Sequence, residues 1–493
     1  MLLTFMLQIA LIYSLVRFLW NYALGIYLAL IMISVLLAFG MANDARGNQQ
    51  FWIVVLLIMP GFGFILYFLW GSPRTNSRWK NNMRNIEDSI FEHMPKNAEE
   101  QKEFRKIHPN KAQISWYLAK KGFPVYKNTK VEYFPLGDDM ADRIIEDLQK
   151  AEKFIFMEYF IVYNGVWWKR IQDVLVQKAA EGVDVRLLID DFGCLFMNVR
   201  SLKKELIDKG IRLYSFAPIH KRVYSLAFNF RNHQKITVID GNVGYTGGIN
   251  LADEYINEIE RFGHWKDTAV RLTGEAVWSL TTTFLVMWED AGHEKEGDID
   301  RYKPQITVEA PGFVQPYSGG PHRNPDNPVE GAYQRIISKA RDYIYISTPY
   351  LVLDIKLQSL LIQAAQSGVD VRIVVPHIYD KWYVYMVNVA YYGILMENGV
   401  RVYEYTPGFN HAKHMVSDDE VAICGTVNLD YRSLCLHYEN GVFFSDNPAV
   451  QDLRNDMDAM FAVSEEITYE KWKKRPLYKK LLGSVLKVFS PLL

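Results

Sequence analysis

The sequence predicts an α/β protein in which two tandem αβα sandwich domains follow N-terminal transmembrane helices. Three observations lead to this prediction. Uncharged apolar runs are concentrated in the first 71 residues, helix-like and strand-like segments alternate after residue 130, and the second half of the chain repeats the first. Alternating helices and strands favour layers with helices on both faces of a mostly parallel sheet.

Residues 1–72 are expected to form a membrane anchor. The runs "ALGIYLALIMISVLLAFG" at 23–40 and "WIVVLLIMPGFGFILYFLW" at 52–70 carry no charge, and about 20 apolar helical residues span a bilayer core. These two runs are predicted to be transmembrane helices. Residues 2–20 form a third apolar run, interrupted by Gln8 and Arg17, which either spans the membrane or lies at its interface. A cleaved signal peptide is disfavoured because two further apolar runs follow and no clear cleavage site is present.

The charges that flank the second span predict the orientation of the anchor. Arg74, Arg78, Lys80 and Arg84 follow it, and basic residues favour the cytoplasmic side. Three scattered cysteines, Cys194, Cys424 and Cys435, form neither a disulfide framework nor a zinc knuckle, as expected of reduced cytosolic thiols. A net charge of −1 gives no basic bias toward nucleic acid, so no nucleic-acid partner is predicted.

An internal repeat divides the remaining chain. "RIIEDLQKAEKFIFMEYFIV" from Arg143 matches "RIISKARDYIYISTPYLVL" from Arg335, and each reads as a helix end followed by a strand. "AAEGVDVRLLIDD" and "AAQSGVDVRIVVPH" match in the same way further on. We therefore expect a connector at 73–130, a first domain at 131–300 and a second domain at 301–493.

The third repeated segment contains the candidate catalytic residues. It reads "NHQKITVIDGNVGYTGGINLADEY" in the first copy and "NHAKHMVSDDEVAICGTVNLDYRS" in the second. Counted from His233, Lys235, Asp240, Gly247 and Asn250 stand at offsets 2, 7, 14 and 17; Lys413, Asp418, Gly425 and Asn428 stand at the same offsets from His411. A single His-x-Lys is a weak signal, but two copies at matched spacing indicate a shared site.

On a strand, residues two apart point to the same face, so each histidine is expected to face the same way as its lysine. Two such clusters that meet between domains suit a phosphodiester. The lysines and asparagines would bind its oxygens and stabilise transition-state charge, one imidazole would attack phosphorus, and the other would transfer the proton. The lysines supply the positive charge, so no metal or other cofactor is predicted.

A metal site at His411 and His414 is the competing interpretation. An odd separation on a strand places these rings on opposite faces, and Ile236 occupies the corresponding position of the first copy. The sequence therefore favours phosphodiester chemistry at His233 and His411.

These motifs closely resemble the phospholipase D superfamily, whose signature H-x-K-x₄-D occurs twice per site. The chain is most similar to the bacterial cardiolipin synthases within it, in "EYFIV", "YTGGINLADEY", "HWKDTAVRLTGEAVW", "STPYLVLD" and "GTVNLDYRSLCLHYENGV". The resemblance implies two phospholipase D-like αβα domains at a bacterial plasma membrane, with the catalytic domains on the cytoplasmic side. It further implies that two phosphatidylglycerol molecules are converted to cardiolipin and glycerol.

By the same resemblance His233 would be the nucleophile and His411 the acid and then the base, although the near symmetry of the site leaves this division open. Asp240 and Asp418 would orient or support the catalytic side chains. Gln234 stands where such enzymes often have Arg. Glu158 in the first copy stands where Ser347 stands in the second, an asymmetry with no assigned role.

Two further questions stay open on the sequence alone. The basic C-terminal segment "KWKKRPLYKKLLGSVLKVFSPLL" is predicted to be an amphipathic element that binds anionic membrane lipid, with a solvated helix packed on the domain as the alternative. A hydrolase, either a phospholipase or a membrane-bound nuclease, would use the same motifs with water as acceptor. A catalytically inactive membrane scaffold is disfavoured by two complete clusters. Oligomeric state is not predicted.

Overall fold

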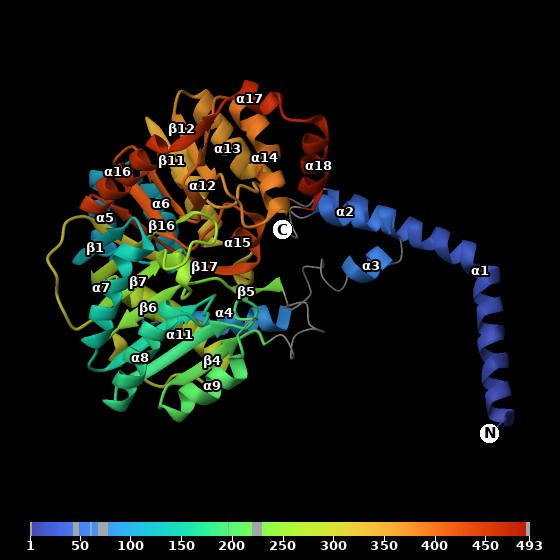
Figure 1. Ribbon diagram of the computed structural model, residues 1–493, viewed down its shortest axis with the longest axis horizontal. Coiled ribbons are helices and arrows are strands. Elements are labelled where there is room, and N and C mark those ends of the chain that lie inside the picture. The colour runs from blue at the N-terminus through green and yellow to red at the C-terminus, as the bar shows by residue number, and fades with distance from the viewer. Residues whose placement is uncertain are drawn as a thin grey trace. The chain divides into compact units, whose positions relative to one another are not determined.

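The structure is a computed structural model that describes residues 2–42, 49–59, 62–67, 77–195, 197–218 and 229–489. It forms two compact units, Met1–Ser77 and Arg78–Leu493 (Figure 1). The predicted runs 2–20 and 23–40 lie in one continuous helix, α1 (Leu2–Ala42). The run 52–70 contributes to α2 (Gln49–Ile58) and α3 (Phe62–Leu66); its residues 60, 61 and 68–70, and Arg74 after it, lie outside the described residues.

Within the described residues, no helix has both the length and the apolar character needed to cross a membrane.

The second unit contains two sheets with equivalent strand orders, except that the second adds β18 at one edge. The first runs β1-β9-β7-β6-β2-β3-β4 and the second runs β10-β17-β16-β15-β11-β12-β13-β18. The strands of the first sheet are β1 (Thr129–Phe134), β2 (Phe154–Tyr159), β3 (Asp184–Asp190), β4 (Arg212–Phe216), β6 (Ile236–Ile239), β7 (Val243–Gly247) and β9 (Ala269–Gly274). The second sheet contains β10 (Phe313–Gly319), β11 (Tyr343–Ser347), β12 (Asp370–Pro376), β13 (Arg401–Tyr405), β15 (His414–Ser417), β16 (Val421–Gly425), β17 (His437–Ser445) and β18 (Ser464–Ile467). The tandem repeat is therefore confirmed as two α/β domains.

The expectation of mostly parallel sheets was wrong. Along the two strand orders given above, β2-β3-β4 and β11-β12-β13 pair in parallel, whereas the other neighbours pair antiparallel. The reason is local: the chain turns back at Asp240 and Gly241, so β6 and β7 form a hairpin, and Asp418 and Asp419 do the same for β15 and β16. All four residues have positive φ, which Gly and Asp tolerate best.

Helices cover the outer face of each sheet. On the first sheet, α7 (Gly137–Gln149), α8 (Val166–Ala180) and α9 (Val199–Asp208) pack against β2 and β3 in one buried apolar cluster. On the second, α12 (Pro328–Lys339), α13 (Ile355–Gln366) and α14 (Trp382–Glu397) pack in the same way. The connector helices are α4 (Ser77–Phe91), α5 (Ala98–Ile107) and α6 (Ala112–Lys120).

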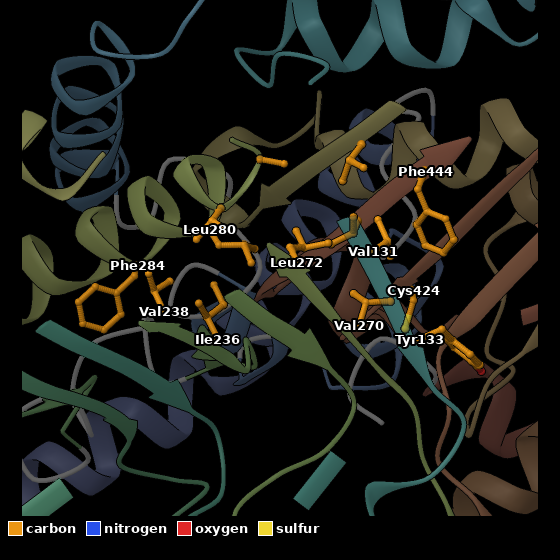
Figure 2. Packing of buried hydrophobic residues seen from close by; sticks show 14 of the residues in the cluster. Val131, Tyr133, Ile236, Val238, Val270, Leu272, Leu280, Phe284, Cys424 and Phe444 are labelled. Carbon is orange, nitrogen blue, oxygen red and sulfur yellow. The ribbon is translucent and has the colours of Figure 1, made fainter. Parts of the chain in front are cut away.

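The inner faces of the two sheets share a single core. It includes α11 (Val277–Gly292) and α16 (Pro448–Ala462), and it joins Ile236 and Val270 of the first sheet to Cys424 and Phe444 of the second (Figure 2). Burial of this apolar surface fixes one domain against the other. The domain interface is therefore rigid enough to hold a site built from both repeats.

Candidate active site

Two short parallel ladders cross from one domain to the other and bring the repeated motifs together. In one, β5 (Arg231–Asn232) pairs with the first residues of β17, with Tyr438 opposite Asn232. In the other, β14 (Gly408–Asn410) pairs with β8 (His264–Lys266), with Asn410 opposite Lys266. The residue after each of these strands is a motif histidine: His233 comes opposite Glu439, and His411 comes opposite Asp267.

Each histidine is thus paired with a carboxylate from the other domain. Nδ1 of His233 lies 2.9 and 3.0 Å from the two oxygens of Glu439, and the His233 amide donates to the Tyr438 carbonyl at 2.9 Å. Nδ1 of His411 lies 2.6 Å from Asp267, and its amide donates to the Lys266 carbonyl at 2.7 Å. An Nδ1–H that donates to a carboxylate leaves Nε2 free for a substrate.

Both lysines fold back onto their own histidines. Nζ of Lys235 donates to the His233 carbonyl at 2.5 Å, and Nζ of Lys413 lies 2.9 Å from Nδ1 of His411 and also contacts the His411 carbonyl. The motif residues had been expected within a strand, but they lie in the extended links before β6 and β15. Each lysine nevertheless lies on the same side as its histidine.

Burial sets the protonation of these groups. It lowers the pKa of Lys235 to about 7 and that of Lys413 to about 8, and the charge of Lys413 contributes to the lowered pKa of Lys235. Burial and the lysine charges lower the pKa of His411 to about 4 and hold the pKa of His233 well below its usual value. Charges from both motifs act on His233, so the two half-sites form one electrostatic unit, with both imidazoles neutral near pH 7.

The asparagine before each histidine fixes the turn of the motif. Oδ1 of Asn232 accepts from the Gln234 amide and Oδ1 of Asn410 accepts from the Ala412 amide, both at 3.2 Å. Their amide nitrogens differ in partner: Asn232 donates to Glu158, whereas Asn410 donates to Ser347 at 3.0 Å. The noted Glu158–Ser347 asymmetry is therefore a difference in how the two motifs are supported.

Asp240 and Asp418 lie at the far ends of β6 and β15, away from the histidines. The carboxylate of Asp240 accepts from the amides of residues 152–154 at 2.7–2.9 Å. Asp418 accepts from the amides of residues 341–343 and also binds the buried Lys111 at 2.5 Å. Neither carboxylate makes one of these contacts with a motif histidine or lysine, so the structure does not place them against the side chains they were expected to orient or support.

Asn250 and Asn428, the expected substrate-binding residues, follow the β6–β7 and β15–β16 hairpins. Oδ1 of Asn250 accepts from the Ile161 amide at 3.0 Å, whereas its buried Nδ2 makes no hydrogen bond of good geometry with any described residue. In Asn428 it is Oδ1 that is buried without a partner in the described chain. Buried polar groups normally have partners, so these amides are suited to contact a ligand.

Comparison with known proteins now identifies the family. The family described as "Cardiolipin synthase, PLD-like domain" matches residues 144–262 and 333–461, and one described as "Phospholipase_D-nuclease N-terminal" matches residues 28–72. The major cardiolipin synthase ClsA of Bacillus subtilis (strain 168) is 33% identical over 94% of this chain and 97% of its own.

The chain belongs to the cardiolipin synthase family.

Further similar proteins and a solved structure agree with this assignment. The cardiolipin synthase of Oceanobacillus iheyensis is 32% identical over 90% of this chain and 93% of its own. An uncharacterized protein of Streptococcus mutans is 41% identical over 90% of this chain. The crystal structure of phosphatidylserine synthase from Haemophilus influenzae Rd KW20 has a TM-score of 0.57, covers 75% of this chain and is 16% identical, which shows a shared fold.

Sequence reasoning had missed Glu439 and Asp267. Asp267 follows His233 by 34 residues and Glu439 follows His411 by 28, so the fixed offsets that revealed the motif do not extend to them. The structure shows their equivalence. Asp267 stands two residues before the strand partner of Gly247, and Glu439 stands two residues before the strand partner of Gly425. A Cβ on either glycine would lie within 2.4 Å of a carbonyl oxygen beside the acidic residue, so both must be glycine.

His437 was also missed. With His233 and Glu439 it forms a group whose metal-ligand atoms all lie within 4.8 Å, and its buried Nδ1 lies 3.7 Å from Glu439. The three could hold a metal ion, but His233 and Glu439 already satisfy each other. His414 does not join the site: its Nε2 faces Met457 and its Nδ1 lies 3.3 Å from the Thr268 hydroxyl.

Proposed function

We propose that this family member joins two phosphatidylglycerol molecules into cardiolipin and glycerol through a covalent phosphatidyl-histidine intermediate. The proposal rests most on the crossed His–carboxylate pairs. Two neutral imidazoles, each held through Nδ1 by the opposite domain, can serve one phosphate as nucleophile and proton carrier without rearrangement.

In the first half-reaction, Nε2 of His233 attacks phosphorus of the first phosphatidylglycerol. The bond from phosphorus to the glycerol oxygen breaks, and this oxygen takes a proton from His411, so glycerol leaves. For this step His411 must carry a proton on Nε2. The bound phosphodiester anion raises the pKa of the imidazole, and Asp267 stabilises the charged ring.

In the second half-reaction, the glycerol hydroxyl of a second phosphatidylglycerol gives its proton to His411. Its oxygen attacks phosphorus, the bond from phosphorus to His233 breaks, and cardiolipin is released. Lys235, Lys413, Asn250 and Asn428 are proposed to bind the non-bridging oxygens. The lysine charges match the charge that builds at phosphorus in each step.

Asp240 and Asp418 are proposed to act indirectly. By accepting from the amides before β2 and β11, they hold the start of the strands that flank each motif. Loss of either carboxylate is expected to lower the stability of its domain more than it lowers the rate of the reaction.

We further propose a multi-pass protein of the plasma membrane, with spans at 23–40 and 52–70 and the catalytic domains in the cytoplasm. The anchor is assigned to 1–72, the connector to 73–130, and the two phospholipase D-like domains to 131–300 and 301–493. The uncharged apolar runs and the basic residues after them support this topology.

The last helix, α18 (Leu477–Val488), supports attachment to anionic lipid. It packs on α14 at Gly483, where a Cβ would meet the Met386 carbonyl at 2.8 Å. Its other face leaves Leu477 and Leu481 81% and 65% exposed beside several lysines. Exposed leucines next to lysines suit a lipid surface.

The function is tested by incubating protein reconstituted in liposomes with phosphatidylglycerol and analysing the lipids by mass spectrometry. Cardiolipin and glycerol in equal amounts are expected. Phosphatidic acid with no cardiolipin would show a hydrolase in place of a transferase. The variant His233→Ala is the control for lipid converted by contaminating enzymes.

A further inference from the structure

A pocket that is partly open to solvent adjoins the His411 half-site. Its wall includes Tyr350 after β11, Asp380 and Lys381 after β12, and Phe409 of β14. Phe409 stands two residues before His411, and their ring centroids are 5.7 Å apart. Its enclosed part has room for about one water-sized group, such as a single hydroxyl, and the rest of the pocket is open to solvent.

The polar groups of the pocket form one connected network. The Tyr350 hydroxyl donates to Asp380 at 2.6 Å and accepts from Nζ of Lys381 at 2.8 Å, and Lys381 lies 3.0 Å from Asp380. This leaves carboxylate lone pairs and ammonium hydrogens for a ligand. A neighbouring pair of hydroxyl groups, each both donor and acceptor, matches such a surface.

Electrostatics tie this network to the catalytic groups. Burial alone would raise the pKa of Asp380, but Lys381, the Tyr350 hydrogen bond and the charge of His411 hold it below its usual value. Asp380 in turn helps to retain the proton of Lys413. Burial raises the pKa of Tyr255, and Tyr350 raises it further. The ring centroid of Tyr255 is 5.4 Å from that of His411.

The first domain lacks this network at the corresponding positions. Ile161 precedes the bridge residue Val162 as Tyr350 precedes Leu351. Cys194 and Leu195 follow β3 at the distances at which Asp380 and Lys381 follow β12. Arg231 stands in the place of Phe409, paired with Asp190 at 3.5 Å. The polyol-matching network therefore belongs to the His411 side alone.

We propose that this pocket binds the glycerol headgroup of phosphatidylglycerol through its vicinal diol, with Asp380, Tyr350 and Lys381 as specificity-determining residues. The inference rests on the proposed transferase function. The leaving glycerol takes its proton from His411 and the acceptor hydroxyl returns one to His411, so both alcohols must pass through the same place. One pocket beside His411 serves the two half-reactions.

A simple alcohol would gain little from the network because it has one hydroxyl to offer. A site built to hydrogen-bond a particular hydroxyl discriminates strongly against a ligand that lacks it. The enzyme should therefore prefer glycerol over ethanol as acceptor, and the preference should depend on the three network residues.

The test is a competition for the phosphatidyl group. Liposomes of phosphatidylglycerol carry the protein, and deuterated glycerol and ethanol are supplied together at equal concentration. Mass spectrometry measures labelled phosphatidylglycerol and phosphatidylethanol. Both products come from the same phosphatidyl-enzyme, so their ratio does not depend on the rate of the first half-reaction. Asp380→Asn and Tyr350→Phe are expected to lower this ratio about tenfold each, the effect of one lost hydrogen bond to a charged or hydroxyl group.

A matched control lies at the opposite end of β12. The Tyr345 hydroxyl donates to Asp370 at 3.0 Å, and Arg372 binds the same carboxylate at 2.6 Å, so Tyr345→Phe and Asp370→Asn remove the same groups away from the pocket. These two should leave the ratio unchanged. Tyr350→Phe removes one oxygen atom and gives the same test if Asp380→Asn does not fold.

The outcomes separate the two proposals. Both products in the native protein with a ratio that neither pocket variant changes would overturn the headgroup pocket while leaving the transferase intact. Neither product, with phosphatidic acid instead, would overturn the transferase and the pocket inference together. A fall confined to the pocket variants supports both.

Discussion

The two half-sites share one geometry but differ in what surrounds it. In the first, His233 is held by Glu439 and lies beside Phe160 and His437, with ring centroids at 5.0 and 5.6 Å. In the second, His411 is held by Asp267 and lies beside Trp265 at 5.5 Å and a polar pocket. The common ladders explain why both histidines can act, and the different surroundings explain how each can have one role.

The difference extends to the carboxylates. The longer Glu439 is held by the hydroxyl of Thr426, whereas Gly248 stands at the equivalent position beside the shorter Asp267. A Cβ at Gly248 would lie 1.9 Å from an Asp267 oxygen. Each acid and its neighbour therefore form a matched set, and the two sets are not interchangeable.

The largest expected effect is loss of either histidine. His233→Ala and His411→Ala should each lower turnover of phosphatidylglycerol by at least ~10⁴-fold, because nucleophile and proton carrier act as a unit. Circular dichroism and the thermal midpoint should stay near those of the native protein. Substantial turnover in one variant would remove that histidine from the mechanism.

Exchange of the carboxylates comes next. Glu439→Gln and Asp267→Asn keep the shape but lose the charge that orients each imidazole, and we expect kcat to fall about 10²–10³-fold. Glu439→Asp and Asp267→Glu should lower kcat nearly as much, because the shorter acid no longer reaches Thr426 and the longer acid does not fit beside Gly248. If these swaps were harmless, the matched sets would have no functional meaning.

The acid-to-base profile should distinguish the two lysines. Their charge is required for the anionic substrate, and it is lost as pH rises through the lowered pKa values of about 7 for Lys235 and 8 for Lys413. kcat/KM should therefore fall above about pH 7–8. Lys235→Arg, whose guanidinium stays charged, should move this limb toward higher pH, and an unmoved limb would assign it to another group.

Replacement of the motif aspartates should affect stability more than chemistry. Asp418→Asn breaks a buried ion pair with Lys111 and should lower the free energy of unfolding by ~3–5 kcal/mol, whereas Asp240→Asn weakens backbone contacts alone and should cost ~1–3 kcal/mol. Chemical denaturation measures both values. Equal costs would mean that Lys111 contributes nothing to the difference.

Removal of metal should have the smallest effect. The lysines supply the positive charge, so turnover after dialysis against EDTA should stay within about twofold of the untreated value. The measurement is the same lipid assay with and without the chelator. Loss of activity that zinc restores would instead assign a metal to His233, His437 and Glu439.

Much of this site could be predicted from local sequence. The doubled His-x-Lys with its glycine and asparagine gave the repeat, and the pattern of helix ends and strands gave the α/β class. The antiparallel half of each sheet was missed because the alternation of helices and strands was taken to imply parallel pairing throughout, whereas tight turns at Asp240 and Asp418 make hairpins of the motif strands. Glu439 and Asp267 were missed because they belong to ladders between distant segments, and no local pattern specifies such pairing.

The same limit applies to the supporting aspartates. Asp240 and Asp418 stand at a fixed offset from the histidines, which suggested a shared site. The offset instead spans a whole strand, so the carboxylates lie at its other end and bind the preceding loops. Spacing along a chain identifies a repeat more reliably than it identifies contact.

The division of roles is the central claim, and a trapped intermediate tests it most directly. His411→Asn removes the proton carrier but leaves His233 free to attack, so incubation with phosphatidylglycerol should leave a phosphatidyl group on His233, found by mass spectrometry of digested protein. His233→Asn should trap nothing on His411. An adduct on His411 in that second variant, with none on His233 in the first, would reverse the roles and contradict this account.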